Sequence, residues 1–185
     1  MRSFIAALLT LVASQATAQR LILDPAASRI WFEASASMGG FRGTAERFSG
    51  WAQVSDTISW SDAAGRVEVD AGSFGTGIAL RNRHLRAHLQ AERFPRILFT
   101  LERAERRGEQ GIILFGTLTI HGVTRTVEIP AAITENRPLI LDGALQTRFT
   151  DWGMSPPSQL GGLARVRDPI TLHFHAVFHP RELDR

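Results

Sequence analysis

Short segments in which apolar and polar residues alternate make up most of this chain. Segment 65–71 alternates without a break, and segments 96–102, 111–120 and 170–178 place large apolar residues at every second position. A period of two is typical of a β-strand with one buried and one solvated face. Further strands are predicted at 29–34, at 43–55 with a bend at Gly50, at 123–129 ending at Pro130, and at 141–149. About eight short strands joined by short links indicate an all-β fold, either an antiparallel sandwich or an up-and-down barrel.

One segment departs from this alternation. Between residues 79 and 92, three leucines recur at near-helical spacing, and arginines fill much of the other face. Pro95 follows, and the residue before a proline favours an extended backbone. We therefore predict one short helical insertion, lying across a mouth of the barrel. A loop rich in proline and glycine, residues 152–162, is predicted to lie at a mouth as well.

The first eighteen residues have the pattern of a secretory signal peptide. Arg2 precedes an apolar run from Phe4 to Val12, and Ala16-Thr17-Ala18 supplies small residues for cleavage. The run is shorter than the roughly 20 apolar residues that span a bilayer. The sequence therefore predicts an exported, periplasmic protein with residues 1–18 as signal peptide and residues 19–185 as one domain.

Composition removes several classes of function. The chain has no cysteine, which excludes disulfides, thiolate metal sites and cysteine catalysis. All 21 basic residues are arginines, but the formal net charge is only +3. The charges also alternate in sign along the chain, whereas a nucleic-acid surface needs a basic stripe with interleaved aromatic residues. We expect no nucleic-acid partner.

Six stretches, in order along the chain, match a known family. They are Leu23-Asp24-Pro25 with Ser28 and Phe32; Phe48-Ser49-Gly50; Arg81-Asn82 with His84-Leu85, Phe94-Pro95 and Phe99; Gly116 to Thr124; Phe149 to Met154; and the closing strand through Phe178. On these residues the chain resembles the YceI-like family of exported lipid-binding proteins.

The resemblance implies a lipocalin-like, eight-stranded antiparallel barrel with a helical insertion. It also implies an apolar tunnel for a long amphiphile, such as an isoprenoid quinone or a fatty acid or amide, and no catalytic cofactor. Family members are periplasmic or secreted, and several are dimers, so a homodimer is compatible with the resemblance. The chain departs from the family at Asn82, where an aspartate is usual, and its segment between His84 and Phe94 is compact.

Alternation and resemblance together give candidate ligand-binding residues. The predicted tunnel lining is Phe32, Phe74, Phe99, Leu101, Leu114, Leu118, Leu145, Phe149, Leu172 and Phe174. The predicted mouth residues are Arg81, Asn82, His84, Trp152 and Met154. Guanidinium groups at a mouth can hold a carboxylate, phosphate or quinone oxygen, or contact an anionic membrane surface transiently. Trp152 and Met154 are suited to an apolar gate.

Three other interpretations remain open. The barrel could have a filled core and act through its surface as an interaction or stress protein. Two histidine pairs, His84 with His88 and His173 with His175, each offer two metal ligands, whereas a catalytic zinc needs three protein ligands. A barrel that spans the outer membrane would present apolar residues outward, but the predicted outer faces carry many charges. There is no Gly-x-Ser-x-Gly nucleophile motif, and we expect no enzyme activity.

Overall fold

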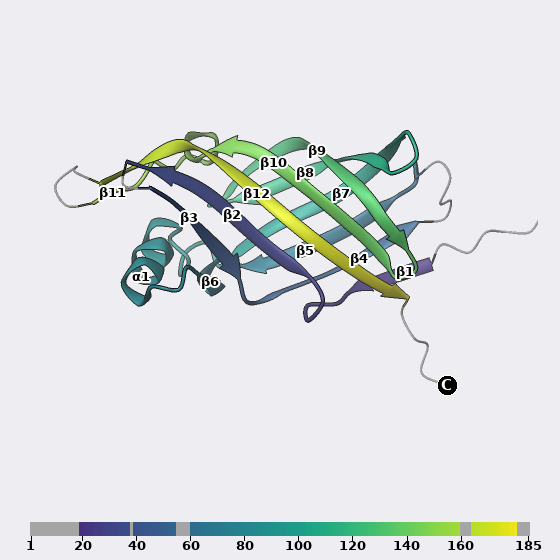
Figure 1. Cartoon of the computed structure of the whole chain (residues 1–185), viewed down its shortest axis with the longest axis horizontal. Helices are drawn as coiled ribbons and strands as arrows, with labels where there is room; N and C mark the ends of the chain where they lie inside the picture. The colour runs from purple at the N-terminus through teal and green to yellow at the C-terminus, as the bar shows by residue number, and fades with distance from the viewer. Residues whose placement is uncertain (1–18, 38, 55–59, 160–163, 181–185) are drawn as a thin grey trace, which may run out of the picture.

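Antiparallel strands wind into a closed barrel with one short α-helix at one end (Figure 1). The structure is a computed structural model, and it describes residues 19–37, 39–54, 60–159 and 164–180. The predicted signal peptide, residues 1–18, lies outside the described residues. The predicted fold, an eight-stranded antiparallel barrel with a helical insertion, is confirmed.

The elements follow the chain in a simple order. The strands are β1 (Gln19–Leu23), β2 (Arg29–Ala36), β3 (Gly39–Ala45), β4 (Phe48–Val54), β5 (Ala64–Asp70), β6 (Phe74–Gly75), β7 (Arg96–Arg107), β8 (Gly111–Ile120), β9 (Val123–Asn136), β10 (Leu139–Arg148), β11 (Ser158–Gln159) and β12 (Ala164–Pro180). The helix α1 (Ala79–His88) lies between β6 and β7, and short 3₁₀ turns η1 (Ala71–Ser73) and η2 (Phe149–Trp152) follow β5 and β10.

The barrel has eight walls, because the strands β1 and β2, β3 and β4, and β5 and β6 each form one bent wall. Both β1 and β2 pair with β12 on one side, and on the other side β1 pairs with β4 whereas β2 pairs with β3. In the same way β3 continues into β4, and β5 continues through η1 into β6. These three bent walls and β7, β8, β9, β10 and β12 close the barrel.

The structure corrects three predicted boundaries. The strand predicted at 43–55 is two, β3 and β4, because the chain changes partners between Ala45 and Phe48. Pro130 does not end a strand, since β9 continues to Asn136. Pro130 pairs with Ile113 of β8, and the ladder between β9 and β10 reaches only to Ala131, so a missing N–H costs little there.

The helix is shorter than predicted. It ends at His88 because Gln90 adopts a left-handed backbone with φ of 46°. No residue of α1 is buried, and Leu80, predicted on its apolar face, is 52% exposed. Leu89, just beyond the helix, is the leucine that enters the core. Other side chains already fill the barrel end that α1 covers. The apolar face of α1 therefore contributes no buried residue to the core.

His121 and Gly122 form the turn between β8 and β9. His121 and Gly122 both have positive φ, of 51° and 76°, as a two-residue type I′ hairpin turn requires. The ring of Phe94 packs against this turn, with its centroid 4.7 Å from that of His121. This places the β8–β9 turn at the same end of the barrel as α1. The opposite end carries the β7–β8 turn and the β9–β10 turn (Figure 1). Trp60 lies at this end, where it lines a hollow together with Arg137 and Pro138 of the β9–β10 turn. We call the two ends the helix end and the Trp60 end.

Candidate functional site

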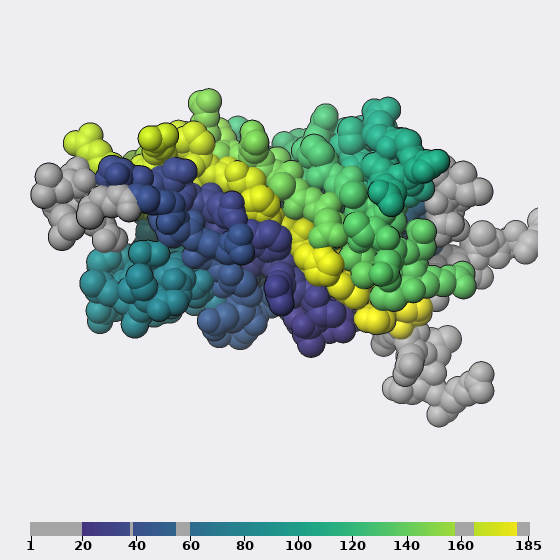
Figure 2. All heavy atoms as spheres, viewed as in Figure 1, coloured from purple at the N-terminus to yellow at the C-terminus, as the bar shows by residue number. Residues whose placement is uncertain are grey.

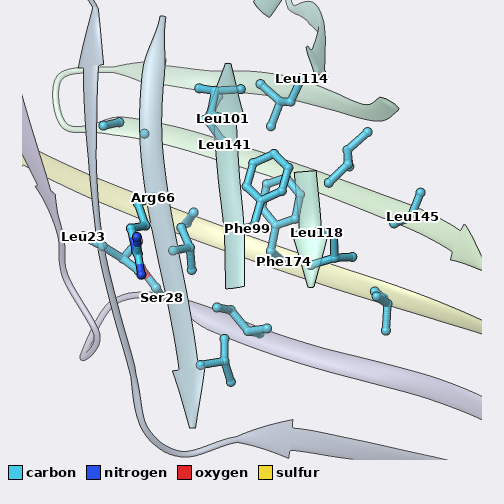
Figure 3. A pocket seen from close by; sticks show the side chains of 18 of the residues that line it. Leu23, Ser28, Arg66, Phe99, Leu101, Leu114, Leu118, Leu141, Leu145 and Phe174 are labelled. Carbon is cyan, nitrogen blue, oxygen red and sulfur yellow. The ribbon is translucent and has the colours of Figure 1, made fainter. Parts of the chain in front are cut away.

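An elongated cavity of about 170 Å³ lies inside the barrel. Labelled side chains from β1, β5, β7, β8, β10 and β12 surround it in Figure 3. Along β10, both Leu139 and Leu145 line it, and six residues at about 3.4 Å each correspond to roughly 20 Å of strand. An eight-stranded barrel is wide enough for one slim ligand. The cavity is therefore long and narrow, and on the face shown in Figure 2 the walls over it are continuous.

The lining is almost entirely apolar, and two of its polar residues, Ser28 and Arg66, have polar partners outside the cavity. Ser28 accepts a hydrogen bond from the Val177 N–H at 2.9 Å and donates to the Val177 carbonyl at 3.5 Å. Arg66 is half exposed and lies 3.7 Å from the carboxylate of Glu68. His173 is the third polar residue of the lining.

His173 belongs to a cluster on the outer face of β2, β3 and β12. Its ring stacks on Trp31 with centroids 5.0 Å apart, and its Nε2 lies 3.6 Å from Glu33 Oε2. Arg42 donates to Glu33 at 2.6 Å, and this guanidinium holds the pKa of Glu33 below its usual value. The interior of the cavity therefore offers few polar groups to a ligand.

Nine of the ten residues predicted to line the tunnel do line the cavity. They are Phe32, Phe74, Phe99, Leu101, Leu114, Leu118, Leu145, Leu172 and Phe174. Phe149 lies outside the lining, although it is buried, because η2 carries it behind the cavity wall at the helix end. There its ring meets the ring of His88 edge-on, with centroids 5.7 Å apart. Ligand binding by these nine residues remains a prediction.

None of the five predicted mouth residues lines the cavity. Trp152 is 1% exposed and Met154 is 5% exposed, so both are core residues and not a solvent-facing gate. The Trp152 indole N–H donates to Thr147 Oγ1 at 3.1 Å, which satisfies its one polar atom inside the core. Alternation cannot reveal this, since η2 interrupts the strand pattern just before these residues.

The three predicted mouth residues on α1 hold the helix in place or face outward. Asn82 Oδ1 accepts hydrogen bonds from the Thr76 N–H at 2.8 Å and from Thr76 Oγ1 at 2.6 Å. Arg81 places its guanidinium 5.1 Å from the centre of the Phe41 ring. His84 is exposed. The arginine-rich helix therefore has contacts of its own at the helix end but none with the cavity.

Two histidines are packed together beneath α1. The Nε2 atoms of His88 and His121 are both buried and have no hydrogen-bond partner in the described part of the chain. Burial, reinforced by the nearby His121, lowers the pKa of His88 below its usual 6.5. A neutral imidazole is thus the stable form of His88 in the folded protein.

Several lining residues escape the sequence reasoning. Trp60, 3% exposed, lies outside every strand, so no periodicity identifies it. Leu23 closes β1, a strand that pattern alone does not predict. Leu139 begins β10, two residues before the predicted strand starts at Leu141, and joins Phe178 of β12 in the lining. These residues gather at the Trp60 end of the barrel.

Neither predicted histidine pair forms a metal site in the structure. Among residues 19–37, 39–54, 60–159 and 164–180, no three histidine, cysteine or acidic side chains lie close enough to hold an ion. His175 instead contacts Asp142, with 2.7 Å between Nδ1 and Oδ1. Within the same described ranges, no helix is long and apolar enough to cross a membrane.

The sequence and the fold both match known proteins. The model of the YceI-like domain matches residues 22–178. This chain belongs to the YceI-like family. No curated protein matches the sequence.

Solved structures of this family share the barrel. BcnA from Burkholderia cenocepacia superposes with a TM-score of 0.76 at 21% identity, over 84% of this chain and 98% of BcnA. A polyisoprenoid binding domain from Saccharophagus degradans gives 0.66 at 13% identity, over 86% of this chain and 98% of that domain. The YCEI protein of Campylobacter jejuni gives 0.65 at 20% identity, over 76% and 85% of the two chains. At these identities the similarity establishes the fold.

Proposed function

We propose that this protein is an exported carrier that binds one long-chain amphiphile with its tail inside the barrel. The observation that carries the proposal is the long cavity with its almost entirely apolar lining. Ten buried methylene groups contribute about 8 kcal/mol, comparable with micromolar binding before the costs of ordering are subtracted. An apolar tail alone can therefore supply useful affinity.

The candidate ligands are polyisoprenoids, including isoprenoid quinones, and fatty acids or amides. The structural relative described as a polyisoprenoid binding domain supports the first class. A slim cavity of about 170 Å³ discriminates by length and width of the tail, and it admits either class. Export to the periplasm is supported by the signal-peptide pattern of residues 1–18.

Binding accounts for the cavity better than catalysis does. Active sites concentrate groups whose pKa is shifted by their surroundings. The described residues with a clearly shifted pKa are Glu33, Asp70, His88 and Asp168. None of these four lines the cavity. The shifts come from surface ion pairs, from turn hydrogen bonds and, at His88, from partial burial of its ring at the end of α1.

Native mass spectrometry of protein purified from the periplasm, followed by organic extraction, tests this function. We expect an added mass that extracts as a prenyl, quinone or acyl lipid, and a shortened chain that starts after residue 18. A protein that stays bare after incubation with octaprenyl lipids and fatty acids would contradict the carrier function. That result would favour a filled-core protein that acts through its surface.

A further inference from the structure

The two ends of the barrel close the cavity very differently. At the helix end, the lining residues Phe74 and Ile120 are backed by a second layer of buried side chains. That layer consists of Ala34, Ala45, Leu89, Phe149, Trp152, Met154 and Ile170, none of which lines the cavity. A ligand entering there would have to displace two layers of packed core.

At the Trp60 end, a single layer separates the cavity from a second hollow. This hollow, which we call the vestibule, has a volume of about 280 Å³. Its described lining is Leu21, Val54, Trp60, Asn136, Arg137, Pro138, Leu139, Phe178 and Pro180. Val54, Trp60, Leu139 and Phe178 line the cavity as well, so one side of each faces the tail space and another faces the vestibule.

Trp60 is the largest of the four shared side chains, and its backbone is unusual. Its φ of 57° is rare for a bulky residue and costs free energy. Its carbonyl accepts hydrogen bonds from the N–H groups of Ala63 at 3.1 Å and Ala104 at 3.3 Å. These contacts hold the backbone while the indole fills the barrel end. Strain of this kind is often kept where a residue has a positional role.

The vestibule supplies polar groups that the cavity lacks. Asn136 and Arg137 are exposed, and both carry N–H donors. Within the described lining of the vestibule, Arg137 is the sole charged residue. Six other described arginines are paired with acids, such as Arg42 with Glu33 and Arg47 with Asp70. In the described part of the chain, Arg137 has no such ion pair.

We propose that the ligand enters tail first at the Trp60 end and that an anionic oxygen head, a carboxylate or a phosphate, rests against Arg137. This inference rests on the proposed carrier function and specifies its portal and its head group. Guanidinium donors match two-oxygen anions well, and a partly enclosed vestibule strengthens the pairing. The arginines of α1, which the sequence suggests as the head-group site, lie at the closed end instead.

Paired ligands test the head group. Affinities for hexadecanoic acid, hexadecyl phosphate and hexadecanol are measured with wild-type protein and with Arg137→Gln. We expect the variant to bind at least one of the two anions about tenfold more weakly, about 1.4 kcal/mol, and the alcohol unchanged. The more affected anion identifies the head. Arg106→Gln is the charge-matched control, because Arg106 lies at the end of β7 beside the β7–β8 turn and donates to the Glu109 carbonyl.

Other outcomes of this titration overturn the inference. Equal loss for acid, phosphate and alcohol would show that Arg137 acts on the fold and not on the head. Loss in Arg81→Gln but not in Arg137→Gln would place the head at the helix end. If neither these three ligands nor octaprenyl lipids bind the wild-type protein, and extraction releases no lipid from it, the proposed function itself fails.

The portal has a separate test, which uses the absence of cysteine from the chain. Asn136→Cys and Leu80→Cys each give a single site for a bulky maleimide. Leu80, 52% exposed on α1, is the counterpart at the helix end. We expect labelling at 136 to slow the association of a fluorescent fatty acid about tenfold or more, and labelling at 80 to leave the rate unchanged. The reverse pattern, or no effect at either site, would exclude the Trp60 end as the portal.

Discussion

The ring of Phe174 lies across Gly143, its partner on the neighbouring strand, so closely that a Cβ atom on Gly143 would stand 2.4 Å from Phe174 Cζ. Phe32 covers Gly43 in the same way, with 2.3 Å between such a Cβ and Phe32 Cε1. Each glycine lets a ring lie along the wall of the barrel. These glycines therefore keep the cavity open by giving the phenylalanines room at its edge.

Gly143→Ala is predicted to narrow the cavity. The new methyl group would also stand 2.9 Å from the Pro130 carbonyl, so the ring of Phe174 has to move inward. We expect a loss of about 1–3 kcal/mol in stability, as for other overpacked cores, together with weaker tail binding. Chemical unfolding and lipid titration measure the two effects. Gly108→Ala is a useful control: its φ of 72° strains a side chain, but no atom lies within 4 Å, so it should cost stability alone. Unchanged lipid affinity in Gly143→Ala would mean that the tail does not pass Phe174.

Most of the barrel follows from its alternation, because nearly every wall has one wet and one dry face. The lining residues on β7, β8 and β12 are accordingly predictable, as Leu101, Leu118 and Leu172 show. Partner exchange is not predictable: the inward face shifts at Glu46 and Arg47, between β3 and β4, but a bulge within one strand would give the same break in the alternation. Periodicity records which face is buried and carries no information about which strand lies beside it.

The ends of the barrel are the part that the sequence predicts least. Trp152 and Met154 lie in a Pro/Gly-rich stretch typical of exposed loops, yet η2 folds them into the core. Trp60 has no periodic neighbours at all, yet it fills the opposite end. Where regular structure stops, burial depends on contacts between distant segments, such as Ala104 N–H with the Trp60 carbonyl. The sequence therefore predicts the mouth at the helix end, whereas the single layer of side chains that closes the cavity is at the Trp60 end.

Leu118→Trp is predicted to block the tail space. Leu118 lines the cavity from β8, between Phe99 of β7 and Arg125 of β9, and it is 6% exposed. The larger indole would occupy the narrow lumen, so we expect lipid affinity to fall at least tenfold, about 1.4 kcal/mol. Thr119→Trp is the matched control, because Thr119 faces outward and bonds Thr124 Oγ1 at 2.8 Å. A circular dichroism spectrum like that of the wild type shows that the barrel still folds. Equal binding by both variants would place the tail elsewhere.

Asn82 is predicted to act as an anchor for α1. Its side chain accepts two hydrogen bonds from Thr76, which fixes the chain as it enters the helix. Asn82→Ala should cost about 1–2 kcal/mol, because two donors of Thr76 lose their acceptor. Asn82→Asp keeps the acceptor and adds a negative charge in the first turns of the helix, where the dipole favours it. We expect its stability to equal or exceed that of the wild type in urea unfolding. Since Asn82 does not line the cavity, lipid affinity should be unchanged in both variants.

Acid is predicted to destabilise the protein through His88. Burial keeps the pKa of folded His88 below 6.5, whereas the unfolded chain binds a proton near that pH. Between the folded pKa and 6.5 the unfolded state holds more protons, so stability falls as the pH drops through this window and is constant above it. The paired carboxylates of Glu33, Asp70 and Asp168 have lowered pKa values, and their contributions are lost only in more acidic solution, below 4.5 for glutamate and 3.8 for aspartate.

Urea unfolding at about pH 7.5 and about pH 5.5, on either side of the ordinary histidine pKa, measures the His88 effect. We expect a lower midpoint at the acidic pH in the wild type and a smaller difference in His88→Phe. Phenylalanine retains an aromatic ring against Phe149 but cannot take up a proton. His179→Phe is the comparison, because His179 is half exposed and lies 3.5 Å from Asp24. Because His179 lies at the surface and not in the core, its replacement should not relieve the acid loss. An identical pH dependence in wild type and His88→Phe would show that the acid sensitivity arises from another group.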